Sequence, residues 1–188
     1  MPFYRTAIEG LLIYEPKVFG DERGYFFESY NEKVFAEHGI TRPFVQDNQA
    51  FSARGVLRGL HYQTGEHAQA KLVRVLQGEV LDVVVDLRPD SKTYGQVYSH
   101  ILSDENKLQM YIPRGFAHGY VVLSKTAVFF YKCDNFYAPQ AEAGIRPQCP
   151  ELNIDWGIPL SEATIAERDR NFPSFGKHKN PFPTPEKA

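Results

Sequence analysis

Short runs of β-branched and aromatic residues, separated by glycine and proline, dominate the chain. In residues 71–87, KLVRVLQGEVLDVVVDL, two apolar runs flank Gln77-Gly78, which predicts a β-hairpin with its tip at that dipeptide. Residues 80–85 are nearly all apolar, as in a strand that is buried on both faces. Further strands are predicted at residues 25–30, 56–62, 97–102, 109–112, 119–123 and 128–132.

Helix signals are few and short. Asn31 is placed to cap a helix that ends at Gly39, and Ser161 is placed to open another over residues 162–170. Many short strands with few helices indicate an all-β sandwich or barrel with short peripheral helices. No repeat or linker interrupts the chain, so residues 1–188 are expected to form a single domain, with a loosely packed Pro-rich tail at 171–188.

Composition and charge exclude several classes of protein. The chain has 188 residues, with 21 basic and 23 acidic side chains and a net charge of −2. This charge balance argues against a protein that coats nucleic acid or binds along an anionic membrane. No apolar run approaches the ~20 residues that span a bilayer, and the first ten residues do not resemble a secretion signal. The two cysteines, Cys133 and Cys149, cannot make a disulfide framework, and we expect reduced thiols in a cytoplasmic protein.

Two half-motifs are similar to those of the cupin superfamily. Residues 55–78 read G-x5-H-x-Q-x7-K-x6-G, and residues 113–118 read P-x-G-x-x-H. Cupins are jelly-roll β-sandwiches, so the resemblance implies a cupin jelly roll for this chain.

The residues at the cupin metal positions do not suit a metal. Metal-binding cupins present three imidazoles and a carboxylate, whereas the corresponding residues here are His61, Gln63, Lys71 and His118. An amide is a poor transition-metal ligand, and an ammonium repels a divalent cation. The sequence therefore predicts no metal, no cofactor, and proton chemistry in the cavity.

Longer strings of sequence resemble a particular family, the dTDP-4-dehydrorhamnose 3,5-epimerases. The strings are DERGYFFE (21–28), FVQDN (44–48), GVLRGLHYQ (55–63), KLVRV (71–75), GEVLDVVVDLR (78–88), IPRGFAHGY (112–120) and YKCDNFY (131–137). The similarity extends over residues 2–172. Enzymes of this family invert C3 and C5 of dTDP-4-dehydro-6-deoxy-glucose on the route to dTDP-rhamnose, so the resemblance implies an isomerase that acts on a sugar nucleotide.

The resemblance implies that His61 is the general base that removes the hydrogen beside the C4 ketone. A neutral imidazole can accept a proton at physiological pH without a metal, and a carboxylate is needed to fix its tautomer. The resemblance implies Asp169 for that role, although spacing alone favours a solvated aspartate on a helix. Asp82, on the strand that returns from residue 78, is the alternative partner.

Proton abstraction places negative charge on the ketone oxygen, and a cation is needed to stabilise it. Lys71 is the strongest candidate, because a lysine inside an apolar strand is costly to bury without an anionic partner. His118 is a candidate for an assisting role. The proton returned to the opposite face requires a separate acid, and the resemblance implies Tyr131.

The nucleotide needs cations for its diphosphate and a surface for its base. Arg58 offers a guanidinium suited to phosphate oxygens, and the resemblance implies that Tyr137 stacks on thymine. It further implies substrate contacts for Arg23, Glu28, Gln46, Asp47, Asn48, Glu142 and Arg168. In that family the residues at 23 and 28 come from a partner subunit, which implies a homodimer.

Two departures from the family leave local contacts and activity open. Arg168 stands where the family usually has lysine, and residues 146–151 replace a segment that usually holds tryptophan and acidic residues. Four alternatives to double epimerisation remain: a mono-epimerase acting at C3 or C5, a 3,4-ketoisomerase, a metal-dependent cupin, and a non-catalytic module that binds sugar nucleotides.

Overall fold

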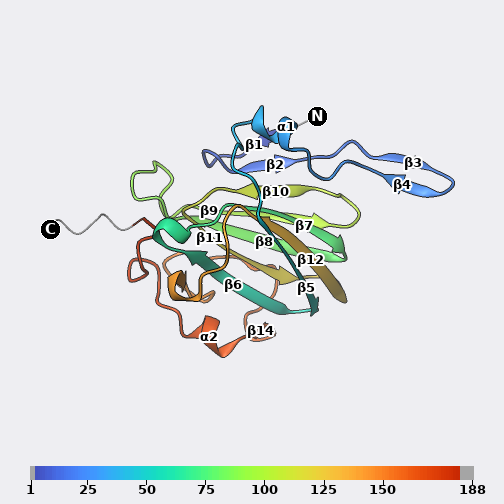
Figure 1. The fold of residues 1–188 in the computed structure, drawn as a ribbon. Helices are drawn as coiled ribbons and strands as arrows, with labels where there is room; N and C mark the ends of the chain where they lie inside the picture. Colours follow the sequence, from blue (N-terminus) through green and yellow to red (C-terminus); the bar gives the residue numbers. More distant parts are fainter. Residues whose placement is uncertain (1–2, 183–188) are drawn as a thin grey trace.

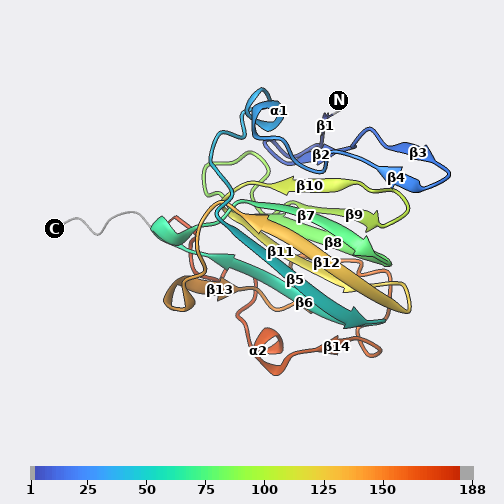
Figure 2. The same cartoon turned by 45° about the vertical axis from the view of Figure 1, so that its right-hand side comes forward.

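The computed structural model describes residues 3–182, and its main feature is a pair of facing β-sheets (Figures 1 and 2). The first sheet has the strand order β1 (Phe3–Arg5), β2 (Leu12–Tyr14), β10 (Gln109–Ile112), β7 (Lys71–Gln77), β12 (Thr126–Cys133) and β5 (Gln46–Ala53). The second has the order β13 (Glu142–Gly144), β6 (Val56–Gln63), β11 (Phe116–Val122), β8 (Glu79–Asp86) and β9 (Val97–Ser103), with β14 (Thr164–Ile165) pairing parallel to β6. The predicted all-β, cupin-like sandwich is confirmed.

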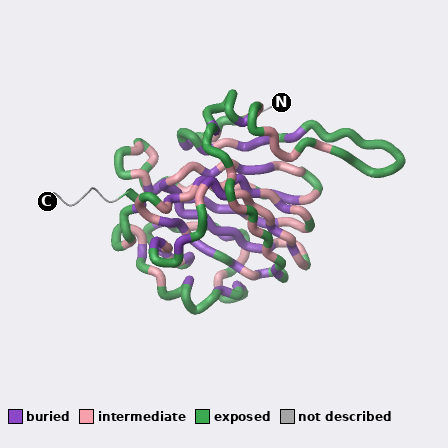
Figure 3. The backbone as a smooth tube through the Cα atoms, viewed as in Figure 1, coloured by how far each residue is buried: buried purple, intermediate pink, exposed green. Residues whose placement is uncertain are grey.

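Helices are short and peripheral, as predicted. They are α1 (Glu32–Ala36), α2 (Glu167–Arg170) and two 3-10 turns at Gly65–His67 and Pro139–Ala141. A separate hairpin of β3 (Phe19–Asp21) and β4 (Gly24–Phe26) extends away from the sandwich and is largely exposed (Figures 1 and 3). No helix among residues 3–182 is long and apolar enough to cross a membrane.

The main core lies between the two sheets. Val73 and Val75 of β7 and Phe129 of β12 meet Val84 of β8 and Val122 of β11, and all five are buried. A second cluster covers the outer face of the second sheet, where Leu57, Val83 and Trp156 are among the buried members. Complete burial of one such side chain stabilises the fold by roughly 1.5–3 kcal/mol.

A turn at Gly78 joins β7 to β8 where the sequence predicts one, but the predicted β-hairpin is wrong: β7 pairs with β10 and β12, and β8 pairs with β9 and β11. Gly78 has a φ of +82°, and a Cβ built on it would lie 2.1 Å from the Thr126 carbonyl oxygen. A side chain at this position would therefore collide with the backbone at the start of β12. The two strands on either side belong to different sheets, so the turn at Gly78 links the sheets at one end of the sandwich.

Local predictions fail where tertiary pairing overrides the sequence pattern. The predicted strand at 25–30 ends at Phe26. α1 follows Asn31, whose side-chain oxygen accepts the Lys33 N–H as predicted, but the helix ends at Ala36, before Gly39. The predicted helix over 162–170 is reduced to α2, because Thr164 and Ile165 pair with β6 instead.

The predicted loose tail is wrong as far as the structure describes it. Tyr62 donates a hydrogen bond to the Lys179 carbonyl (2.6 Å), and the Gly65 N–H donates to the Pro181 carbonyl (2.8 Å). Phe175 packs against Tyr94, with 5.3 Å between ring centroids. Residues 171–182 are therefore fixed on the sandwich, while residues 183–188 lie outside the described part of the chain.

Candidate active site

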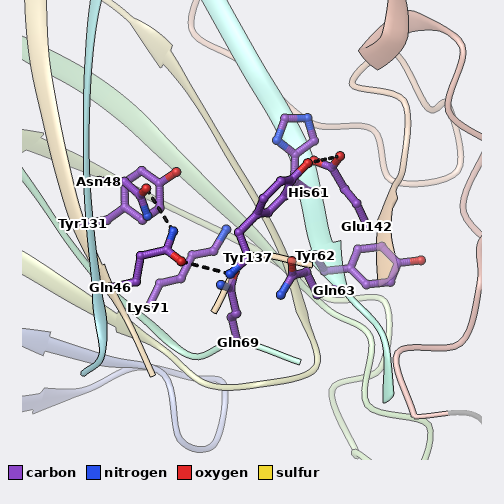
Figure 4. A pocket seen from close by; sticks show the side chains of 10 residues that line it. All are labelled: Gln46, Asn48, His61, Tyr62, Gln63, Gln69, Lys71, Tyr131, Tyr137 and Glu142. Atoms are coloured by element: carbon purple, nitrogen blue, oxygen red, sulfur yellow. Dashed lines mark hydrogen bonds between the residues drawn. The ribbon is translucent and has the colours of Figure 1, made fainter. Parts of the chain in front are cut away.

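A polar cavity lies at one end of the space between the sheets. It has two adjoining lobes of about 280 and 270 Å³, and His61, Lys71 and Tyr131 line both of them. Strand alternation places Lys71 on the inward face of β7 with Val73 and Val75. The cavity therefore lies next to the main core, in the same space between the sheets, but is lined by polar side chains. Figure 4 shows the side chains of the larger lobe converging from β5, β6, β7 and β12.

His61 is held by a buried carboxylate. Its Nε2 lies 2.8 Å from Oδ1 of Asp169, whose other oxygen accepts the Gly59 N–H at 3.1 Å. Asp169 is only 3% exposed. Burial raises the pKa of Asp169, but hydrogen bonding to His61 and to the Gly59 N–H outweighs burial and brings it below 3.8. An ionised carboxylate accepts from Nε2–H, which leaves the lone pair of Nδ1 as the basic site.

Asp82 does not serve His61, because it is bonded to a second histidine. Both carboxylate oxygens of Asp82 lie within 3.0 Å of His118 Nε2, and both side chains are buried. Burial lowers the pKa of His118, and the attraction of Asp82 opposes this effect. His118 stands opposite His61 in the pairing of β11 with β6, so two carboxylate-bonded imidazoles face the cavity from the second sheet.

Lys71 points into the cavity without an anionic contact. Its Nζ lies 5.5 Å from the centre of the Tyr131 ring, and among residues 3–182 it has no hydrogen bond or ion pair. Burial lowers the pKa of Lys71, while Cys133, Asp82 and Glu142 raise it. The ammonium is therefore available to an oxygen that becomes negative in the cavity.

Tyr131 reaches the cavity from the sheet opposite to that of His61. It pairs with Val73 of β7 and Asn48 of β5. Burial raises the pKa of Tyr131 to about 12, so its phenol carries a proton at neutral pH. The cavity thus has a carboxylate-held imidazole on one side and a protonated phenol on the other.

The remaining lining residues form a hydrogen-bonded rim. The hydroxyl of Tyr137 donates to Glu142 Oε2 at 3.0 Å, and Arg168 donates to the same oxygen at 2.9 Å. Gln46 donates to Asn48 Oδ1 (3.1 Å) and accepts the Tyr137 N–H (2.9 Å). These contacts hold Tyr137 at the cavity, where Figure 4 shows its ring directed toward Glu142.

Three predicted site residues do not reach this cavity. Asp47 lies on the opposite face of β5 from Gln46 and Asn48, with its carboxylate 2.8 Å from Lys132 Nζ. Asp47 therefore does not line the cavity of its own chain, and this geometry gives no support to its predicted contact with substrate. Arg23 and Glu28 are exposed on and next to the projecting hairpin, and Arg23 pairs with Asp21.

Arg58 lines the second lobe, where its Nε donates to Ser52 Oγ at 3.2 Å. Tyr120, opposite Arg58 in the pairing of β11 with β6, lines this lobe too. Tyr120 is a site residue that was not predicted, although it lies two residues after His118 and so on the same face of its strand. Gln63 was not predicted to have a role in the site, yet its side-chain oxygen accepts the Ala138 N–H at 2.7 Å and so fixes the loop that carries Tyr137.

The divergent segment 146–151 lies away from the cavity, on the outer side of the second sheet. Cys149 is buried there and bonds Glu151 at 2.9 Å. Among residues 3–182, no three histidine, cysteine or acidic side chains cluster in a way that could hold a metal ion.

Comparisons with known proteins show the family of the chain. The model of the family described as dTDP-4-dehydrorhamnose 3,5-epimerase matches residues 5–177. A relative of that name from Pseudomonas aeruginosa is 56% identical over 173 residues, which cover 91% of this chain and 94% of the relative.

Two crystal structures share the fold. A dTDP-4-dehydrorhamnose 3,5-epimerase from Elizabethkingia anophelis NUHP1 is 55% identical, with a TM-score of 0.92 over 96% of this chain and 98% of the other. A dTDP-6-deoxy-D-glucose-3,5-epimerase from Legionella pneumophila, in complex with dTDP-4-keto-L-rhamnose, is 48% identical, with a TM-score of 0.90 over 94% and 93% of the two chains. The chain belongs to the dTDP-4-dehydrorhamnose 3,5-epimerase family.

Proposed function

We propose that His61, Asp169, Lys71 and Tyr131 together carry out the double epimerisation of dTDP-4-dehydro-6-deoxy-glucose. Membership of the family makes the chain an isomerase that acts on a dTDP-linked sugar. The observation that carries the assignment of roles is the placement of a carboxylate-held imidazole and a protonated phenol on opposite sheets around one cavity. A sugar between them meets a base on one face and an acid on the other.

In the proposed reaction His61 takes the proton from a carbon next to the C4 ketone, and the C–H electron pair moves to make an enolate. Lys71 stabilises the negative oxygen, since its ammonium has no anionic contact within residues 3–182. The C–C double bond then takes a proton from Tyr131 on the opposite face, and the ketone forms again. The configuration is inverted with no net oxidation, so the balance requires no cofactor.

One inversion leaves His61 protonated and Tyr131 as a phenolate. A proton must leave the imidazole and another must reach the phenolate before the second carbon reacts. Exchange with water accomplishes both transfers, because the cavity opens to solvent and the His61 side chain is 24% exposed. The same four residues can then act at the second carbon.

The proposed nucleotide subsite is the rim of the cavity. Tyr137 offers an exposed ring for thymine, and Arg58 and Arg168 offer guanidinium groups for the diphosphate. We further propose that Gln46, Asn48, Glu142 and His118 contact the substrate, since all four line one lobe or the other.

We also propose that the active unit is a homodimer in which Arg23 and Glu28 enter the cavity of the other subunit. In its own chain neither residue lines the cavity, and the hairpin that carries Arg23 exposes large apolar side chains, with Phe19 54%, Tyr25 62% and Phe26 70% exposed. Burial of such a surface favours association. We place the protein in the cytoplasm, where thiols such as the unpaired Cys133 and Cys149 stay reduced.

The deciding experiment is incubation with dTDP-4-dehydro-6-deoxy-glucose in heavy water, followed by proton NMR. Deuterium at both C3 and C5 of an inverted product supports double epimerisation. Label at one carbon would identify a mono-epimerase, and migration of the ketone would identify a 3,4-ketoisomerase. Binding of dTDP without any exchange would leave only a binding module.

Two substitutions separate the base from the acid. His61→Asn should abolish exchange at both carbons while dTDP binding, measured by calorimetry, is retained. Tyr131→Phe should still permit wash-in of deuterium without inversion, because the base remains and only the proton donor is lost. Wild-type inversion rates in either variant would overturn the assignment of that residue.

A further inference from the structure

The C-terminal segment that follows α2 places an aromatic ring against the catalytic histidine. The centroids of the Phe172 and His61 rings lie 5.7 Å apart with an interplanar angle of 70°, an edge-to-face arrangement. Such pairs contribute about 0.5–1.5 kcal/mol beyond their buried area and favour a defined orientation. Phe172 is half-buried and does not line either lobe of the cavity.

The ring of Phe172 fits because residue 144 has no side chain. A Cβ built on Gly144 would lie 2.5 Å from both Cδ2 and Cε2 of Phe172. Gly144 pairs with His61 between β13 and β6, so the space left by the glycine adjoins the backbone that carries the base. The absence of a side chain at Gly144 therefore leaves space for an aromatic ring next to the imidazole.

Other contacts hold the ring and its segment in place. The guanidinium carbon of Arg168 lies 5.9 Å from the Phe172 ring centre, so the ring has the imidazole and a cation as neighbours. Just beyond it, the Pro173 carbonyl accepts the Arg146 N–H at 3.1 Å, and the Phe175 N–H reaches Cys149 Sγ at 3.1 Å. The contact with His61 is thus part of a fixed arrangement.

We propose that Phe172 is a positioning residue that fixes the plane of the His61 imidazole for proton abstraction. The hydrogen bond to Asp169 fixes one nitrogen of the ring but leaves the ring free to turn about that bond. The edge contact with Phe172 comes from a different direction and restricts this turn. The proposal rests on the proposed function, since it requires His61 to be the base.

Proton transfer from carbon is sensitive to such restriction. A displacement of about 1 Å in a reacting group can cost about 100-fold in rate. Because Phe172 stays outside the cavity lining, its loss should change the rate of the chemical step and leave substrate affinity intact. Gly144→Ala is a less clean test, since the new Cβ would also lie 2.7 Å from the Leu60 carbonyl oxygen.

The test compares kcat and KM for three variants of the full chain. Phe172→Ala should lower kcat by about 10- to 100-fold with KM within about twofold of the wild type. Phe172→Leu fills much of the same space and should recover part of the lost kcat. Phe175→Ala is the matched control: it removes a ring from the same segment, packed on Tyr94 rather than on His61, and should keep kcat within about twofold of the wild type.

Thermal unfolding confirms that each variant is folded at the assay temperature. An unchanged kcat in folded Phe172→Ala would overturn the proposal, and so would equal losses in Phe172→Ala and Phe175→Ala, which would indicate general loosening of the segment. Absence of epimerisation by the wild-type protein would instead overturn the proposed function. The two failures are therefore distinguishable.

Discussion

His61 Nε2 and Asp169 Oδ1 lie 2.8 Å apart although 108 residues separate them in the chain. The contact forms because β14 pairs parallel with β6, matching Ile165 with Leu57, and α2 starts two residues after β14. Asp169 thereby arrives beside the strand that carries His61. The base and its orienting carboxylate depend on this one parallel pairing, at the edge of an otherwise antiparallel sheet.

Replacement of Asp169 by asparagine should abolish most of the activity and leave dTDP binding intact. The amide has nearly the same shape but no charge, so it no longer stabilises the imidazolium and permits the wrong tautomer. In a Ser-His-Asp triad the same change lowers kcat by about 10⁴-fold, and we expect a comparable loss here. Steady-state kinetics with calorimetric titration of dTDP measure both quantities.

The matched control is Glu167→Gln, the same change at an exposed position of α2, which should leave kcat unchanged. If Asp169→Asn kept more than a tenth of the wild-type kcat, Asp169 would not be the residue that orients His61.

Lys71→Met should separate activity from stability. The long apolar side chain fills the same space but offers no charge to the enolate, so kcat should fall by about 100-fold or more. Burial lowers the pKa of Lys71, which means that the unfolded chain binds this proton more strongly than the folded one. The proton therefore costs folding free energy once the pH falls below 10.5, the ordinary lysine value, and methionine removes that cost at pH 7.

The measurement is urea unfolding at pH 7 beside the activity assay. The unfolding free energy of Lys71→Met should equal or exceed that of the wild type while the activity is lost. Lys125→Met, at an exposed turn position before β12, is the control for a change of charge alone. A large loss of stability in Lys71→Met would contradict an ammonium without anionic contacts.

Sequence reasoning predicts this fold and site well where the chemistry is local. The turn at Gly78 needs a glycine for steric reasons, and the apolar runs on either side of it form β7 and β8 as predicted. β5, in contrast, reads QDNQAFSA and has no apolar alternation. It becomes a strand because its backbone pairs with β12 along eight positions, and its inward side chains face a polar cavity instead of the core.

The same limit explains the differences from prediction around the site. Alternation along β5 turns Asp47 away from the neighbours with which the FVQDN motif grouped it. Proline in residues 171–182 indicated a loose tail, yet those residues are held by hydrogen bonds to partners more than 25 residues away, such as Arg146 for Pro173 and Tyr62 for Lys179. The local sequence pattern does not determine strand register or long-range pairing. The contact of Phe172 with His61 could therefore not be predicted from the sequence.

Asp86 should make the stability of the fold depend on acid pH. Burial alone would raise the pKa of this carboxyl, but hydrogen bonds from Arg88, Ser91 and Thr93 lower it from 3.8 to about 2. A lowered pKa stabilises the fold above the ordinary value, and the gain is lost as the pH falls toward 2. At about 1.4 kcal/mol per pH unit, the contribution at pH 7 is about 2 kcal/mol.

Urea unfolding of Asp86→Asn between pH 2 and pH 7 tests this expectation. The variant should be less stable than the wild type by about 2 kcal/mol at pH 7, and the difference should shrink as the pH falls from 4 to 2. Asp90→Asn, an exposed position in the same loop, should show no such trend. A deficit that stays constant with pH would mean that the hydroxyl contacts, and not the charge, stabilise the loop.

The proposed exchange of Arg23 between subunits predicts recovery of activity in mixed dimers. Arg23→Ala should lack a cation at the cavity of its partner, and His61→Asn should lack the base in its own cavity, so each homodimer is inactive. In a mixed dimer one cavity has His61 from its own chain and Arg23 from the other, while the second cavity lacks both. If subunits mix at random in equal amounts, half of the dimers are mixed, and about a quarter of the wild-type activity should return.

Unfolding and refolding the two variants together, then assaying inversion, gives the result directly. The control mixes His61→Asn with Asp169→Asn, because both substitutions affect the cavity of their own chain. In each mixed dimer one cavity lacks His61 and the other lacks Asp169. No cavity is complete, so no activity should return. Recovery in the first mixture but not in the second locates Arg23 in the partner's cavity. If Arg23→Ala were fully active alone, or if the first mixture stayed inactive while subunit exchange was verified by mass, the hairpin would not contribute to the other subunit's site.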